Sequence, residues 1–92
     1  MNVNFTPQAR DDLLAIRDWI AADNQRTAED VLSRIRQTAL RFGQFPLLGR
    51  KGRVAGTREF GVTGLPYTSF SITASETDID VLAIAHQRRR FP

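Results

Sequence analysis

The sequence predicts an α+β domain in which an antiparallel helical hairpin packs on one face of a small antiparallel sheet. Two observations lead to this fold class. Apolar side chains in residues 7–42 recur at the 3.6-residue period of amphipathic helices, whereas from residue 58 onward they recur at the two-residue period of strands. Because 92 residues are ordinary for one domain and too few for two, we expect a single domain over residues 1–92.

The first half of the chain predicts a short strand followed by two helices. Residues 3–5 alternate as in a strand, and Thr6 then suits the N-cap of a helix over residues 7–22. A second helix is expected to open at Thr27 with a variant of the capping-box pattern and to close at Gly43 with a left-handed cap. The short connection between the helices makes them antiparallel neighbours.

The second half predicts a meander of three strands. Residues 58–62 form the first strand and residues 67–73 the second, with a turn at Gly64-Leu65-Pro66 between them. Residues 78–85 form the third and most apolar strand, which we expect to lie inside the sheet. The predicted order of elements is therefore β-α-α-β-β-β.

Several classes of protein and of site are disfavoured by composition. Cysteine is absent, so disulfide bonds and thiolate metal sites are unavailable, and the single histidine cannot form a histidine pair for zinc. A nucleotide-binding glycine pattern is also missing, so we expect neither metal nor cofactor. Asp78 and Asp80 lie on one side of a strand, where we expect structural roles. Without a signal peptide or an apolar run of about 20 residues, we expect a cytoplasmic protein with no membrane contact.

Positive charge is concentrated in the second half of the chain. Residues 1–46 hold six arginines and six acidic residues, whereas residues 47–92 hold the whole net charge of +3. The basic residues there form one group after the second helix and another after the last strand: Arg50, Lys51, Arg53 and Arg58, then His86, Arg88, Arg89 and Arg90. We expect both groups to border one concave face, which would attract phosphate groups or acidic protein segments. A solvated charged rim is the alternative.

Four further residues each allow two interpretations. His86 is either a packed histidine at the end of a strand or a general base, because its pKa lies near the working pH. Leu14 and Leu40 fall outside the apolar stripes of their helices, and Trp19 lies on the flank of its helix. These three side chains are either isolated exposed apolar residues or the place where a partner's helix lies.

Six short motifs occur in an order that spans nearly the whole chain. They are Phe5-Thr6-Pro7-Gln8-Ala9, the run from Asp12 to Asn24, Phe45-Pro46-Leu47-Leu48-Gly49-Arg50, Gly56-Thr57-Arg58-Glu59, Gly64-Leu65-Pro66-Tyr67, and Ile84-Ala85-His86-Gln87-Arg88-Arg89. With these motifs the chain resembles the ParE branch of the RelE/ParE superfamily of bacterial type II toxins. The order and coverage of the motifs, rather than any one of them, make the resemblance specific.

The resemblance implies a toxin with a RelE/ParE-like fold, silenced by a ParD-like antitoxin that is encoded beside it. Such pairs form hetero-oligomers that reach operator DNA only through the antitoxin, and they serve in plasmid stabilisation. ParE-type members inhibit DNA gyrase, whereas RelE-type members cut messenger RNA on the ribosome. On this basis we expect Leu14, Trp19 and Leu40 to contact the antitoxin. The expected target-binding residues are Arg58, Arg88, Arg89 and Arg90.

The residues help to choose between these two activities. RNA cleavage through the 2′-hydroxyl needs a base, an acid and cations around the scissile phosphate. Arg58, His86 and Arg89 could supply part of such a set, but the chain ends in Phe91-Pro92, without the terminal tyrosine or histidine that the ribonuclease branch often uses. We therefore favour a gyrase inhibitor that is not itself an enzyme. A RelE-like endoribonuclease and a non-toxic relic that still binds antitoxin are the alternatives.

Overall fold

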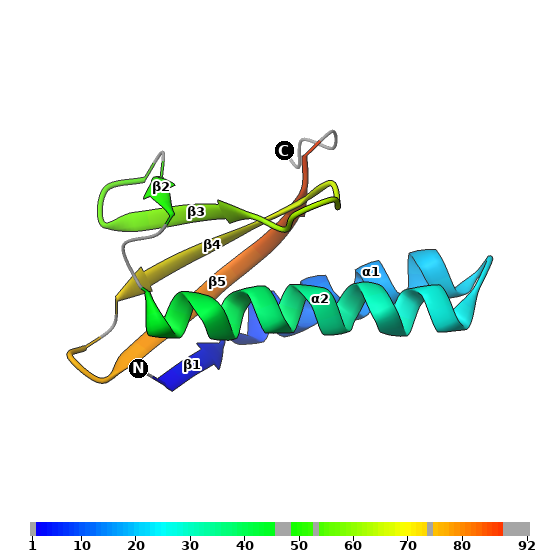
Figure 1. The fold of residues 1–92 in the computed structure, drawn as a ribbon, viewed down its shortest axis with the longest axis horizontal. Coiled ribbons are helices and arrows are strands. Elements are labelled where there is room, and N and C mark those ends of the chain that lie inside the picture. Colours follow the sequence, from blue (N-terminus) through cyan, green and yellow to red (C-terminus); the bar gives the residue numbers. More distant parts are fainter. Residues whose placement is uncertain (1, 46–48, 53, 74, 88–92) are drawn as a thin grey trace.

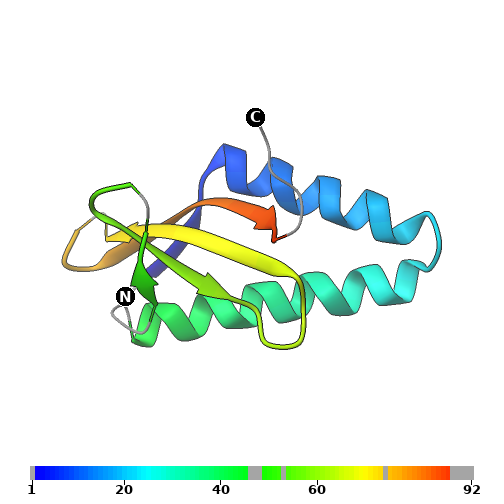
Figure 2. The ribbon, with the colours of Figure 1, turned by 90° about the horizontal axis from the view of Figure 1, so that it is seen from above.

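The computed structural model describes residues 2–45, 49–52, 54–73 and 75–87. Its elements confirm the α+β class and the helical hairpin on one face of the sheet, with the sheet forming one layer and the helices the other (Figure 1). In chain order they are β1 (Asn2–Phe5), α1 (Pro7–Ala21), α2 (Gln25–Gln44), β2 (Arg50–Lys51), β3 (Thr57–Gly61), β4 (Tyr67–Thr73) and β5 (Asp78–His86). Seen from above, the closed end of the hairpin extends beyond the sheet (Figure 2).

The sheet has five strands in the order β1-β5-β4-β3-β2. Strands β3, β4 and β5 form the predicted antiparallel meander, and β5 lies between β1 and β4, as expected for the most apolar strand. Two details differ from the prediction. β1 pairs with β5 in parallel, so the sheet is mixed, and the additional two-residue strand β2 pairs with β3. Both pairings join segments that are distant or very short, and local periodicity does not reveal them.

The ends of the helices follow the predicted rules at one position and depart from them at two. Thr6 is the N-cap of α1, and its hydroxyl accepts a hydrogen bond from the backbone N–H of Ala9. Helix α2, however, begins earlier than expected, because Asn24 caps it by accepting from the N–H of Thr27 at 3.1 Å. Gly43 does not end α2 as a left-handed cap. It is buried in the last turn of the helix, which continues past it.

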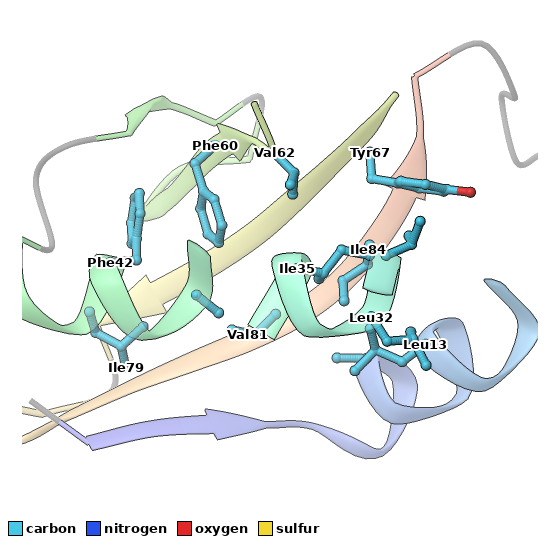
Figure 3. Close-up of a cluster of buried hydrophobic side chains, with 13 residues drawn as sticks. Leu13, Leu32, Ile35, Phe42, Phe60, Val62, Tyr67, Ile79, Val81 and Ile84 are labelled. Carbon is cyan, nitrogen blue, oxygen red and sulfur yellow. The ribbon is translucent and has the colours of Figure 1, made fainter. Parts of the chain in front are cut away.

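The core lies between the helical hairpin and the inner face of the sheet (Figure 3). The rings of Phe42 on α2 and Phe60 on β3 stack with their centroids 4.1 Å apart. Tyr67 on β4 is also buried. Ser69 is fully buried on the same face, and among the described residues its hydroxyl has no hydrogen-bond partner. The remaining labelled members of the core are Leu13, Leu32, Ile35, Val62, Ile79, Val81 and Ile84.

Helix α1 is joined to β5 by two hydrogen bonds just beyond the end of β1. β5 contains a bulge at Leu82, where its register with β4 shifts by one residue. The Thr6 hydroxyl donates to the carbonyl oxygen of Leu82 at 2.9 Å, and the carboxylate of Asp12 accepts from the backbone N–H of Ile84 at 2.9 Å. Two backbone groups of β5 that β1 does not reach, the carbonyl of Leu82 and the N–H of Ile84, are therefore satisfied by side chains, as a buried backbone requires.

Candidate protein-binding surfaces

Helix α2 separates two hollows on the surface of the molecule. Leu32, Arg36 and Leu40 follow each other at four-residue intervals and project from one flank, whereas Thr38 and Arg41 project from the other. The first flank borders a hollow of 480 Å³, the hairpin groove, lined by Val3, Asn4, Phe5, Arg10, Leu13, Leu14, Arg17, Leu32 and Arg36. The second borders a hollow of 440 Å³, the β3 hollow, lined by Thr38, Arg41, Phe42, Gly49, Arg50, Glu59, Phe60, Gly61, Thr63 and Gln87.

The hairpin groove combines an apolar floor with a basic rim. Its floor includes Leu13 from α1 and Leu32 from α2, both buried. Its rim carries Arg10, Arg17 and Arg36, and none of its lining residues is acidic. Arg17 forms an ion pair with Asp18 at 3.1 Å, but both side chains are largely exposed, so this pair neutralises little of the charge. The groove is therefore suited to an acidic partner with apolar side chains.

The β3 hollow is shaped by a close approach at Gly49. A Cβ atom there would lie 2.5 Å from Cζ of Phe42 and 2.6 Å from the carbonyl oxygen of Glu59, so only glycine fits between helix and strand. The carbonyl oxygen of Gly49 accepts a hydrogen bond from Nη1 of Arg58 at 3.0 Å. Both contacts place the following residue, Arg50, at the mouth of the hollow.

A buried carboxylate lies next to this arginine. The Glu59 side chain is 7% exposed, and its Oε2 lies 3.3 Å from Nε of Arg50, whose side chain is 76% exposed. A charge so deeply buried requires a partner of opposite sign, and Arg50 is its partner among the described residues. Together with Arg41, the hollow thus presents two guanidinium groups above one carboxylate.

Comparison with known proteins decides what kind of molecule carries these two hollows. Residues 3–91 match the family described as the ParE toxin of the type II toxin-antitoxin system parDE. The chain belongs to this ParE toxin family. The protein Y4kP of Sinorhizobium fredii is 28% identical to it over 91 residues, which make up 98% of this chain and 92% of that relative.

Solved structures of toxins share the fold of this ParE-family chain. The chromosomal ParDE system of P. aeruginosa superposes with a TM-score of 0.82 at 21% identity, covering 94% of this chain and 95% of that one. The RelBE2 toxin-antitoxin complex of Mycobacterium tuberculosis gives 0.67 at 22% identity, with 92% and 95% covered. The YoeB/ParE toxin of Agrobacterium tumefaciens gives 0.61 at 17% identity, with 94% and 98% covered. These likenesses confirm the expected RelE/ParE-like fold.

Arg58 and His86, two of the three residues in the predicted ribonuclease set, lie at different levels of the sheet. Arg58 pairs across the sheet with Ser71, and His86 pairs with Tyr67, four residues earlier on β4. These levels are about 13 Å apart along the strand. Arg89, the third residue of the predicted set, lies outside the described residues, as do Arg53, Arg88 and Arg90.

The two basic groups meet the β3 hollow only in part. From the first group Arg50 lines it, while Arg58 is half-buried and supports Gly49 from beneath. From the end of β5 it is Gln87 that lines the hollow. His86 instead packs edge-to-face against the ring of Tyr67, with centroids 5.4 Å apart and an angle of 88° between the planes. This geometry agrees with the interpretation of His86 as a packed strand-end residue.

The three apolar residues that were expected to lie outside the core are exposed, as predicted. Leu14 is 46% exposed, Trp19 is 65% exposed and Leu40 is 59% exposed. They do not form one patch. Leu14 lines the hairpin groove and Leu40 follows Arg36 by one turn, whereas Trp19 lies on the opposite flank of α1, close to the end of the hairpin.

Asp78 and Asp80 take part in hydrogen bonds within the outer face of the sheet. Nδ2 of Asn4 lies 3.3 Å from a carboxylate oxygen of each. The pKa of Asp78 is lowered below its usual value, chiefly because the hydroxyl of Thr77 donates to it and then because Asn4 does. The described residues contain no cluster of three or more His, Cys, Asp and Glu side chains that could hold a metal ion. No helix in the described part of the chain is long and apolar enough to span a membrane.

The arginines of the hairpin groove were not among the predicted site residues. Arg10 and Arg17 precede and follow Leu14 by four and three residues, so all three project from one flank of α1. Arg36 stands in the same relation to Leu40 on α2. This spacing is visible in the sequence, but the fold decides that these flanks of α1 and α2 lie next to each other beside β1. Phe45 and Val54, exposed at 56% and 69%, were also not anticipated.

Proposed function

We propose that this ParE-family chain inhibits DNA gyrase by binding to it, in the cytoplasm, and that a ParD-like antitoxin keeps it inactive. The family match over residues 3–91 carries the proposal, because it extends over the entire α+β fold rather than over one motif. The separation of Arg58 from His86 supports a binding toxin over a ribonuclease, since general acid–base catalysis needs its groups within hydrogen-bonding reach of one substrate.

In this proposal the target-binding surface comprises Arg58 and the C-terminal residues Arg88, Arg89 and Arg90. Arg58 contributes indirectly. Its guanidinium group donates a hydrogen bond to the carbonyl oxygen of Gly49 and so positions the next residue, Arg50. Arg50 then adds an exposed guanidinium group to the surface. The antitoxin contacts are proposed for Leu14 in the hairpin groove, for Leu40 one turn after Arg36 on α2, and for Trp19 on the other flank of α1.

The proposal is tested by assaying the purified chain in two systems, supercoiling by DNA gyrase and messenger cleavage on translating ribosomes. We expect inhibition of supercoiling, accumulation of cleaved DNA and intact messenger RNA. Ribosome-dependent cleavage that disappears in His86→Ala would overturn the proposal in favour of the ribonuclease. Inactivity in both assays, together with normal binding of the antitoxin encoded by the neighbouring gene, would identify a relic that has lost toxicity.

A further inference from the structure

The connection between β3 and β4 over residues 62–66, the β3–β4 turn, begins with the geometry of a type II turn. The backbone N–H of Leu65 donates to the carbonyl oxygen of Val62 at 3.0 Å and so closes a four-residue turn. Gly64, its third residue, has a positive φ of 76°, whereas Thr63 does not have a positive φ. A type II turn requires this combination. The carbonyl oxygen of Thr63, between the two central residues, takes no part in the turn's own hydrogen bond.

Helix α2 supplies a donor to this carbonyl oxygen. Nη2 of Arg34 donates a hydrogen bond to the carbonyl oxygen of Thr63, 29 residues later in the chain, and the turn lies beside α2 (Figure 2). A Cβ atom at Gly64 would lie 3.1 Å from the same nitrogen, so the guanidinium group of Arg34 lies close against the turn. Among the described residues Arg34 forms no ion pair. Its guanidinium group is therefore not drawn from the turn by a described carboxylate.

The other end of the turn holds the chain at the end of β5. The backbone N–H of Gln87, the residue directly after β5, donates to the carbonyl oxygen of Pro66 at 2.7 Å, and the turn lies next to this end of β5 (Figure 1). One residue earlier, His86 pairs with Tyr67 at the start of β4. Gln87 directly precedes Arg88, the first arginine of the proposed target-binding tail. The β3–β4 turn thus connects α2 to the residue from which the tail continues.

We propose that Arg34 is a positioning residue, which fixes the β3–β4 turn and, through the turn, the backbone of Gln87 at the base of the arginine tail. This inference rests on the proposed function in one respect, since it takes the tail to bind the target. Arg34 acts through the turn and does not itself contact the target. A chain whose point of departure from the sheet is fixed in advance loses less conformational freedom when the tail binds, and this raises its affinity.

Amide hydrogen exchange of Gln87, measured by NMR on the free full-length chain, tests the positioning. We expect Arg34→Ala to speed the exchange of the Gln87 N–H by about fivefold, which corresponds to the loss of one hydrogen bond of ordinary strength. Arg34→Lys keeps a donor and should restore most of the protection. Arg26→Ala removes an exposed arginine from the same helix and should change nothing. Equal exchange of Gln87 in Arg34→Ala and in the wild type overturns the proposal.

A reference amide separates this effect from a general loss of stability. The N–H of Gly52 donates to the carbonyl oxygen of Thr57 at 2.8 Å, at the opposite end of β3 from the turn. Its exchange should be the same in Arg34→Ala as in the wild type. If the exchange of Gly52 and Gln87 rises by the same factor, Arg34 stabilises the whole fold rather than the base of the tail, and the proposal is wrong.

A second variant loosens the turn without removing the arginine. Gly64→Ala places a side chain at a positive φ, where alanine is strained, and its Cβ atom would press on Nη2 of Arg34. We expect the Gln87 N–H to exchange faster in this variant also. Wild-type exchange of Gln87 in Gly64→Ala would show that the turn does not hold the base of the tail, and it would overturn the proposal.

Supercoiling by purified gyrase tests the consequence for the target. We expect Arg34→Ala and Gly64→Ala to need about threefold more chain for half-inhibition, and Arg34→Lys and Arg26→Ala to inhibit like the wild type. Full inhibition by Arg34→Ala despite faster exchange of Gln87 would show that the target does not require a fixed base, and it would overturn the role of Arg34. If the wild-type chain itself does not inhibit gyrase, the proposed function fails, and the exchange rates alone confirm or overturn the positioning of Gln87.

Discussion

Substitution Asp12→Ala tests whether α1 holds the bulged part of β5 through a single carboxylate. Oδ2 of Asp12 accepts from the backbone N–H of Ile84 at 2.9 Å, 72 residues away in sequence, while Oδ1 accepts from the side chain of Gln8 at 2.8 Å. Alanine would leave the N–H of Ile84, which is buried, without this acceptor. It would leave the rest of the helix unchanged, because alanine is the best helix former.

The expected loss follows from the kind of hydrogen bond that is removed. A hydrogen bond to a charged group contributes about 1.5–3 kcal/mol to the free energy of unfolding. Because the Asp12 side chain is only partly buried, we expect about 1.5–2 kcal/mol. In a domain of this size each kcal/mol shifts Tm by about 4–8 °C, so Tm should fall by about 6–16 °C. In Asp12→Asn, which keeps an acceptor oxygen but not the charge, Tm should fall by less than in Asp12→Ala.

Thermal unfolding followed by circular dichroism measures this loss, with Asp11→Ala as the control. Asp11 is the exposed neighbour of Asp12 on the same helix, and its substitution removes the same charge. An exposed substitution of this kind changes stability by about 0.5 kcal/mol or less. If Asp12→Ala and Asp11→Ala melt at the same temperature, the bond from Asp12 to Ile84 does not stabilise the fold, and the reasoning is refuted.

Four further predictions concern other sites. Gly49→Ala should lower the free energy of unfolding, measured by urea denaturation, by about 1–3 kcal/mol, because the new Cβ atom would meet Phe42 and Glu59. Gly61→Ala is the control, since a Cβ atom there would lie 3.6 Å from its nearest neighbour. An equal loss of stability in both variants would contradict the prediction. Ser69→Ala should stabilise by about 1 kcal/mol by removing a buried hydroxyl without a partner among the described residues, and a loss of stability would show that the hydroxyl is bonded. Thr77→Val should raise the pKa of Asp78 in an NMR titration. An unchanged pKa in this variant would refute the role of Thr77. In the wild type the pKa of Asp78 is lower in the folded state than in the unfolded state. The stabilisation linked to Asp78 is therefore present above its unfolded pKa of about 3.8 and is lost as the pH falls through the folded value. Truncation after residue 87 should keep the fold, since β5 ends at residue 86, and should abolish inhibition of the target; toxicity that survives would show that the arginine tail is only a solvated end.

Local patterns were sufficient for most of the fold. The change of apolar period near residue 58 located the helices and the meander, and Thr6 marked the start of α1 through the chemistry of its hydroxyl. The errors arose where two local signals competed or where packing decided. Asn24 and Thr27 are both good capping residues, and the sequence alone does not rank them. Gly43 is helical rather than left-handed because it is buried in the last turn of α2.

The candidate surfaces were predicted less completely, because they assemble residues that are far apart in sequence. The exposure of Leu14 followed from its position on α1, since helical geometry is local. The hairpin groove, however, joins Arg10 to Arg36 and to the edge of β1, and that meeting depends on the parallel pairing of β1 with β5. In the same way, Arg58 was predicted as a target-binding residue, but its hydrogen bond to the carbonyl oxygen of Gly49 could be seen only in the structure.

The central claim is that this ParE-family chain is a gyrase-binding toxin neutralised by its antitoxin. A supercoiling assay with purified gyrase, titrated first with the chain and then with the antitoxin, tests it most directly. We predict that relaxed plasmid remains unsupercoiled as the chain is added and that supercoiling returns when the antitoxin reaches the concentration of the chain. Full supercoiling at every concentration of correctly folded chain would contradict the claim.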